Sequence, residues 1–147
     1  MVEPSPILLA EDNAYDAELT MKALAEAGLA NRIVHVSDGA QALDYLRRQG
    51  SWADRTTANP VVVILDIKMP LVDGIEVLDA IRADPELKLL PVVMLSSSSE
   101  KQDLQRSYEL GTNAYVVKPV KFAEFIPAVR EIGVFWALIN EKAPTLN

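Results

Sequence analysis

The chain has 147 residues, of which 50% are hydrophobic and 24% are charged, and its formal net charge is −7. This size and composition are typical of one globular domain with its own hydrophobic core. The negative charge argues against a protein that binds a nucleic-acid backbone, the absence of cysteine excludes disulfides and thiolate metal sites, and one histidine cannot build a zinc site of the histidine type.

Short aliphatic runs alternate along the chain with segments of helical spacing. The runs predict strands at Ile7–Ala10, Ile33–Val36, Val61–Leu65, Val92–Leu95 and Ala114–Val117. Apolar residues three or four positions apart predict helices at Asp16–Ala27, Ala40–Gln49, Gly74–Ala83, Lys101–Leu110 and Phe122–Asn140. This alternation predicts an α/β fold, a three-layer doubly wound sandwich with a five-stranded parallel sheet. We expect one domain over residues 1–147, with its core at about 5–140 and a tail at 141–147.

Polar side chains follow four of the predicted strands. Glu11 and Asp12 follow the first strand, Asp66 the third, Ser96 the fourth and Lys118 the fifth. Open parallel sheets bind ligands beyond the carboxyl ends of their strands, so we expect these side chains to meet. Clustered carboxylates repel one another and must share protons or be neutralised by a cation, and an all-oxygen set suits Mg²⁺. With a lysine and a hydroxyl nearby, the set suits phosphoryl transfer to an aspartate.

Each of these residues also has a simpler interpretation. Asp66 alone could be a turn residue or a helix cap, and Lys118 alone could be a surface lysine. Glu11 and Asp12 could merely open a loop, with Asn13 as the cap of the first helix. Their combination at neighbouring strand ends favours the site over the separate explanations.

Four segments resemble, in their order and placement, the response-regulator receiver domain. They are AEDN (10–13), LDIKMPLVDG (65–74), LSSSS (95–99) and YVVKP (115–119), and the resemblance covers roughly Ser5 to Asn140. It implies the flavodoxin-like strand order 2-1-3-4-5. It also implies a stand-alone response regulator of a two-component phosphorelay. Such a protein is phosphorylated by a sensor histidine kinase and is not an enzyme acting on a separate substrate.

The resemblance gives the matching residues of the site their roles. Asp66 would be the phosphoacceptor, and Lys118 would pair with the phosphoryl group. Asp12 would bind Mg²⁺ directly and Glu11 would hold it mainly through water, with Asp66 and the backbone carbonyl of Lys68 as the other ligands.

The resemblance also implies a switch. Ser96 takes the place of the switch hydroxyl and Tyr115 that of the switch aromatic, although a strand tyrosine is more often simply a core residue. The Lys118–Pro119 peptide would be cis. Ser97 departs from the alanine or other small residue usual after the switch position, and Ser98 or Ser99 would cap the fourth helix.

The long loop around Trp52 and the pair Phe135–Trp136 narrow the resemblance to single-domain regulators of bacterial phytochrome kinases. Residues 134–139 are apolar on all sides of the predicted last helix. They predict a homodimer through Phe135, Trp136 and Ile139, or else a turn folded back over its own domain. Only residues 141–147 follow this helix, so we expect output through protein contacts or a downstream phosphotransfer protein.

Two other function classes fit the sequence less well. A phosphatase working through an aspartyl phosphate commonly has an acid two residues after its nucleophile, where this chain has Lys68. A nucleotide- or flavin-binding module would have a glycine-rich first turn, where this chain has AEDNAYD. No segment has the features of a signal peptide or a membrane span, so we expect a cytoplasmic protein without membrane or nucleic-acid partners. His35, within an apolar run, is expected to be structural.

Overall fold

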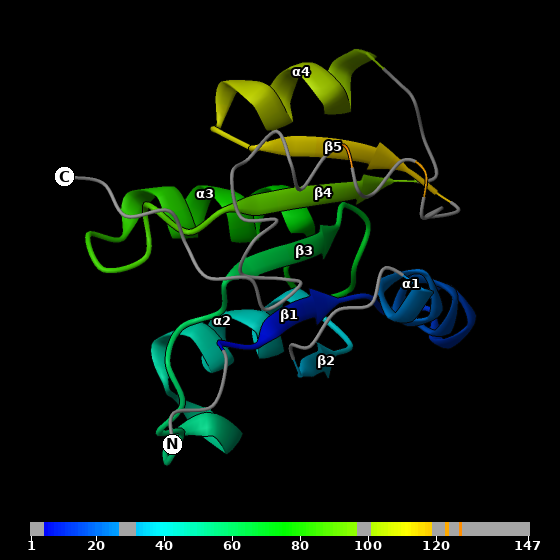
Figure 1. Ribbon diagram of the computed structural model, residues 1–147. Coiled ribbons are helices and arrows are strands. Elements are labelled where there is room, and N and C mark those ends of the chain that lie inside the picture. Colours follow the sequence, from blue (N-terminus) through cyan, green and yellow to red (C-terminus); the bar gives the residue numbers. More distant parts are fainter. Residues whose placement is uncertain (1–4, 27–31, 97–100, 119–122, 124–126, 128–147) are drawn as a thin grey trace, which may run out of the picture.

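The computed structural model describes residues 5–26, 32–96, 101–118, 123 and 127 (Figure 1). Its strands are β1 (Ile7–Ala10), β2 (Ile33–Val36), β3 (Val62–Asp66), β4 (Val92–Ser96) and β5 (Ala114–Val117). Its helices are α1 (Ala14–Glu26), α2 (Gly39–Arg47), α3 (Gly74–Ala83), α4 (Lys101–Glu109) and the short 3₁₀ helix η1 (Gly50–Trp52). The predicted fifth helix lies almost wholly outside the described residues.

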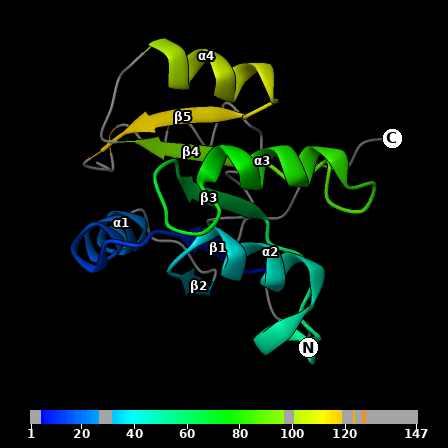
Figure 2. The ribbon, with the colours of Figure 1, turned by 180° about the vertical axis from the view of Figure 1, so that it is seen from behind.

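The five strands form one parallel sheet in the order β2-β1-β3-β4-β5, which confirms the predicted fold and strand order. Helices α2 and α3 cover one face and α1 covers the other, as the two opposite views show (Figures 1 and 2). Alternate strand residues supply the two cores: Leu8 and Leu65 pack with α2 and α3, whereas Leu9 and Ile64 pack with α1. Every residue of β1, β3 and β4 is buried, which explains why these strands are apolar almost throughout.

Side-chain caps fix where the helices begin. Asp38 accepts a hydrogen bond from the backbone N–H of Gln41 at the start of α2, and Asp73 and Glu76 form a capping box at the start of α3. Asn13 accepts from the backbone N–H of Asp16, and α1 therefore begins two residues earlier than the apolar spacing predicts. The caps place the amino ends of α1 and α3 beside the carboxyl ends of the strands (Figure 1).

Two arginines tie loops to the helices. The guanidinium of Arg55 lies 4.3 Å from the centre of the Tyr45 ring and donates to the carbonyls of Tyr45, Thr57 and Ala58. These contacts give the long loop after α2 a defined course, including η1, which no sequence periodicity predicted. Arg82 of α3 donates to the carbonyls of Lys88, Leu90 and Gly111 and to the side chain of Asn113. Within the described part of the chain, no helix is long and apolar enough to cross a membrane.

Candidate functional site

The predicted acidic residues meet at the carboxyl edge of the sheet. Glu11 and Asp12 follow β1, and one carboxylate oxygen from each of Glu11, Asp12 and Asp66 lies within 4.8 Å of the other two. Glu11 is fully buried and Asp66 is 5% exposed, whereas Asp12 faces the solvent. The grouping of these three residues is as the sequence predicted.

The sequence predicts that Asp66 follows the third strand, but in the structure Asp66 is the last residue of β3. It is opposite Leu95 of β4 in the sheet, and the next residue, Ile67, donates its backbone N–H to the carbonyl of Leu95 at 2.9 Å. The chain then turns sharply, and the N–H of Gly74 reaches the carbonyl of Ile67 at 2.8 Å. A Cβ atom on Gly74 would lie 2.2 Å from the carbonyl oxygen of Asp66, so only glycine allows this close return. The sheet and this turn together fix the backbone of Asp66.

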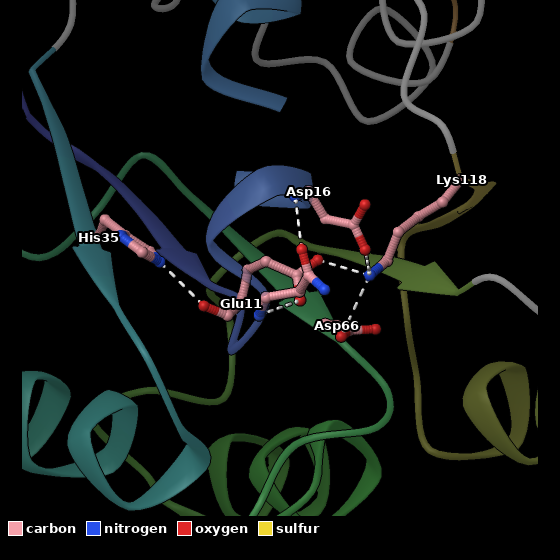
Figure 3. A network of polar contacts seen from close by, with 6 residues as sticks. Glu11, Asp16, His35, Asp66 and Lys118 are labelled. Carbon is pink, nitrogen blue, oxygen red and sulfur yellow. Dashed lines mark hydrogen bonds and ion pairs between the residues drawn. The ribbon is translucent and has the colours of Figure 1, made fainter. Parts of the chain in front are cut away.

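Lys118 closes the site from the end of β5 (Figure 3). Its Nζ atom lies 2.5 Å from Glu11 Oε1, 3.1 Å from Asp16 Oδ2 and 3.2 Å from Asp66 Oδ2. Its backbone N–H donates to the carbonyl of Ser96 at 2.7 Å, which fixes the lysine to the end of β4. The lysine thus lies where the sequence predicted. Asp16, in the first turn of α1, is a partner that sequence reasoning missed.

The burial of these charges shifts their protonation. Burial and the neighbouring Asp66 carboxyl group raise the pKa of Glu11, Lys118 offsets part of the rise, and the resulting pKa is about 7. Burial alone would lower the pKa of Lys118, but its hydrogen bonds to Glu11 and Asp16, and then the charges of Asp66 and Glu11, raise it above its ordinary value. The Lys118 ammonium therefore keeps its proton and its positive charge, and the Glu11 carboxyl is partly protonated near neutral pH.

Backbone contacts orient Glu11 as well. Its second carboxylate oxygen accepts the N–H of Asn13 at 3.2 Å, and its own N–H donates to Val36 at 3.0 Å. The Nε2 atom of His35 lies 2.9 Å from the carbonyl oxygen of Glu11 (Figure 3). His35 thus contacts the backbone of the acidic pair and not its carboxylates, in agreement with the structural role expected for it.

Ser96 and Tyr115 lie on the same face of the sheet. Tyr115 is opposite Met94, and Val117 is opposite Ser96, two residues further along both strands. Ser96 is 2% exposed, while Tyr115 is partly buried against the core that α2 and α3 cover. Both interpretations of Tyr115 in the sequence, core aromatic and neighbour of the switch hydroxyl, are compatible with this position.

Several predicted residues lie outside the described part of the chain or have a role that rests on the resemblance alone. The side chain of Lys68 is exposed, and the role of its carbonyl as a metal ligand rests on the resemblance. Pro119, and with it the Lys118–Pro119 peptide, lies outside the described residues, as do Ser97, Ser98 and Ser99. The residues predicted at a dimer interface, Phe135, Trp136 and Ile139, lie outside them too.

Known proteins with similar sequences and structures are response regulators. The chain is 40% identical over 134 residues to the probable methanogenesis regulatory protein FilR2 of Methanothrix harundinacea, covering 91% of this chain and 84% of that protein. It is 34% identical over 133 residues to response regulator Rcp1 of Synechocystis, covering 90% and 89% of the two chains.

Solved structures give the same result. The bacteriophytochrome response regulator AtBRR superposes with a TM-score of 0.86 at 55% identity, covering 95% of this chain and 99% of that chain. The Mn²⁺-bound form of Rcp1 superposes with a TM-score of 0.76 at 33% identity, covering 97% and 100%. These likenesses confirm both the broad resemblance and the narrower one to phytochrome-associated regulators. The family model described as "Response regulator receiver domain" matches residues 7–130, and the chain therefore belongs to the response-regulator receiver family.

Proposed function

We propose that Asp66 of this response regulator accepts a phosphoryl group from a sensor histidine kinase and that the change alters how the protein binds its partners. The observation that carries this proposal is the convergence of Glu11, Asp12 and Asp66 within 4.8 Å, with Lys118 Nζ 3.2 Å from Asp66. A nucleophilic carboxylate, a cation and an acidic pair are the components that phosphoryl transfer to an aspartate requires.

The acidic group fits a divalent metal ion. The raised pKa of Glu11 reflects its burial and its closeness to Asp66, and a cation in this position would favour the charged carboxylates. Glu11, Asp12 and Asp66 would hold Mg²⁺, and the backbone carbonyl of Lys68 would complete the protein ligands. The donors are all oxygen atoms, which suits Mg²⁺ or Mn²⁺, and the similar regulator Rcp1 has a Mn²⁺-bound form. When bound, the ion neutralises charge on the phosphoryl oxygens.

The transfer step is a displacement at phosphorus. A carboxylate oxygen of Asp66 forms the new P–O bond, while the bond from phosphorus to the donor atom breaks and its electron pair leaves with the donor. That atom is an imidazole nitrogen when the donor is a phosphohistidine and a carboxylate oxygen when it is acetyl phosphate. Lys118 lies within contact distance of Asp66 and is placed to donate to a phosphoryl oxygen.

Phosphorylation of Asp66 would change the positions of the Ser96 and Tyr115 side chains. An acyl phosphate carries roughly −1.5 to −2 charges and three acceptor oxygens where a carboxylate had been. The hydroxyl of Ser96 would turn toward one of these oxygens. Since Tyr115 lies on the same face of the sheet, it would move into the space that Ser96 leaves and change the surface beside α4.

The narrower proposal concerns partners. The similarity to a bacteriophytochrome response regulator supports a bacterial phytochrome as the kinase, with the reaction taking place in the cytoplasm. Output would pass through protein contacts or to a downstream phosphotransfer protein, and not through catalysis on another substrate. We further propose a homodimer through Phe135, Trp136 and Ile139, supported by the apolar character of residues 134–139. Light scattering of the protein at micromolar concentration tests this, and a monomeric mass contradicts it.

The experiment for the main proposal uses acetyl phosphate and Mg²⁺ with intact-mass spectrometry. Wild-type protein should gain one acid-labile phosphoryl group, and Asp66→Asn should gain none. Asp79→Asn is a matched control, since Asp79 is an exposed aspartate on α3 away from the acidic group, and it should behave like wild type. An adduct that persists in Asp66→Asn, or no adduct on wild-type protein, would refute the assignment of Asp66.

A further inference from the structure

Lys118 has a partner outside the strand-end residues of the site. A lysine ammonium has three N–H donors. In this structure they face three different carboxylates, those of Glu11, Asp16 and Asp66 (Figure 3). Asp16 differs from the other two in coming from a helix, and Asn13 fixes its backbone by accepting the Asp16 N–H at 2.9 Å. Its contact with Lys118 therefore results from a capped helix start.

Building on the proposed function, we infer that Asp16 is a positioning residue that holds the Lys118 ammonium in the unphosphorylated protein and competes with the phosphoryl group for it. The three acceptors of Lys118 are not equal in what they lose when the lysine turns away. The side chain of Glu11 is fully buried and that of Asp66 is 7% exposed, whereas that of Asp16 is 33% exposed. Water can replace Lys118 at Asp16 but hardly at Glu11. Breaking the contact with Asp16 therefore costs less free energy than breaking the contact with Glu11.

The charges at the site give the competition its direction. Phosphorylation replaces the single negative charge of Asp66 with roughly −1.5 to −2. The Asp16 carboxylate is then a like charge near the phosphoryl group and a rival for the same ammonium. Neutralising Asp16 should therefore favour the phosphorylated form once enough Mg²⁺ is present. The same change removes a negative charge near the metal ligands, so it should also weaken Mg²⁺ binding.

The test compares wild type with Asp16→Asn, using acetyl phosphate at saturating Mg²⁺. The phosphoryl group moves from the acetate oxygen to Asp66, with acetate as the leaving group. We expect Asp16→Asn to be phosphorylated about threefold to tenfold faster, a range set by Coulomb energies between partly exposed charges. Its Mg²⁺ half-saturation should move to a higher concentration. A purely structural role would instead lower the melting temperature and slow the reaction.

Three further variants isolate the contact. Glu18→Gln removes the same charge from an exposed position of α1, and Glu18 makes no ion pair with Lys118, so it should behave like wild type. Asp16→Glu keeps the carboxylate and should return the rate toward that of wild type. Asp16→Ser removes the carboxylate with a different side chain and is expected to match Asp16→Asn, which separates the contact from any folding defect of one variant.

A second measurement needs neither metal nor phosphoryl donor. The ammonium of Lys118 can be followed by NMR in metal-free protein with ¹⁵N-labelled lysine, assigned by its absence in Lys118→Arg. We expect its exchange with water to quicken in Asp16→Asn and to stay unchanged in Glu18→Gln. The inference is overturned if the Lys118 ammonium of Asp16→Asn exchanges with water as slowly as that of wild type, or if the phosphorylation rate of Asp16→Asn does not rise. If Asp66 were not the phosphoacceptor, wild type would stay unphosphorylated or the adduct would persist in Asp66→Asn, while the NMR signal would still report on Asp16.

Discussion

Lowering the pH from about 8 to about 6 should weaken Mg²⁺ binding by about tenfold. The reason is the proton on Glu11. This carboxyl is fully buried beside Asp66, and its pKa is raised to about 7 from an ordinary 4.5. A metal ion that uses the Glu11 carboxylate, directly or through water, must first displace that proton, so acid competes with the metal.

The magnitude follows from the pKa. At about pH 8 roughly one tenth of Glu11 is protonated, and at about pH 6 roughly ten elevenths, so the apparent association constant falls by about tenfold, or about 1.4 kcal/mol. A glutamate that kept its ordinary pKa of 4.5 would change binding over this interval by only a few per cent, by the same arithmetic. The structure therefore predicts a dependence that ordinary carboxylates would not give.

Calorimetry in two buffers of different ionisation enthalpy measures both the affinity and the protons released. Metal binding should release close to one proton at about pH 6 and about a tenth of one at about pH 8. Glu11→Gln should bind Mg²⁺ more weakly but lose the pH dependence. Because His35 contacts the carbonyl of Glu11, His35→Gln is the control. A dependence that survives Glu11→Gln and vanishes in His35→Gln would refute the assignment to Glu11.

Three further predictions concern stability and the turn after β3. In the absence of metal, the folded protein holds a proton on Glu11 that the unfolded chain has released, so its free energy of unfolding should fall by about 3 kcal/mol as pH rises from about 4.5 to about 7. Urea titrations of Glu11→Gln should show a flatter decline, and a decline as steep as that of wild type would contradict the prediction. Gly74→Ala places a Cβ atom 2.2 Å from the carbonyl of Asp66, so it should cost at least about 2 kcal/mol in urea unfolding and slow phosphorylation by acetyl phosphate, with Ala80→Gly on the same helix as the control for stability alone. Arg82→Lys keeps the charge but cannot reproduce the four hydrogen bonds of the guanidinium, so it should destabilise by about 2 kcal/mol, nearly as much as Arg82→Ala; full stability in the lysine variant would show that charge alone suffices.

The fold was predictable because each strand carries its own signal. Three of the five strands are buried on both faces, and the sequence there is almost uninterruptedly aliphatic. The strand ends placed Glu11, Asp66 and Lys118 at one edge, since the carboxyl ends of parallel strands share an edge. The limits of β3 were less certain from sequence, because Asp66 is polar and yet is opposite Leu95 as the last residue of the strand. Backbone pairing, not side-chain polarity, decides where such a strand ends.

The parts that sequence reasoning missed depend on contacts between distant residues. Asp16 looked like an ordinary acid in the first turn of a helix, and its meeting with Lys118 bridges 102 positions of the chain. The signal that pointed to it was Asn13, a good cap that lies three residues before Asp16 and fixes the start of the helix. The course of the loop at 48–60 depends on Arg55 stacking on Tyr45, which no periodic pattern encodes.

The backbone also suggests how a local event at Asp66 would reach the surface. Lys118 and Ser96 are joined by a hydrogen bond of 2.7 Å between the lysine N–H and the serine carbonyl, which links the ends of β4 and β5. Under the proposed function, one residue of this pair donates its ammonium to the phosphoryl group and the other its hydroxyl. Both contacts with the phosphoryl group would act on the linked ends of β4 and β5. Tyr115 lies on β5, three residues before Lys118. A phosphoryl group that engaged only one of them would strain the shared hydrogen bond, so the two contacts should form together, which favours a two-state switch over a graded one.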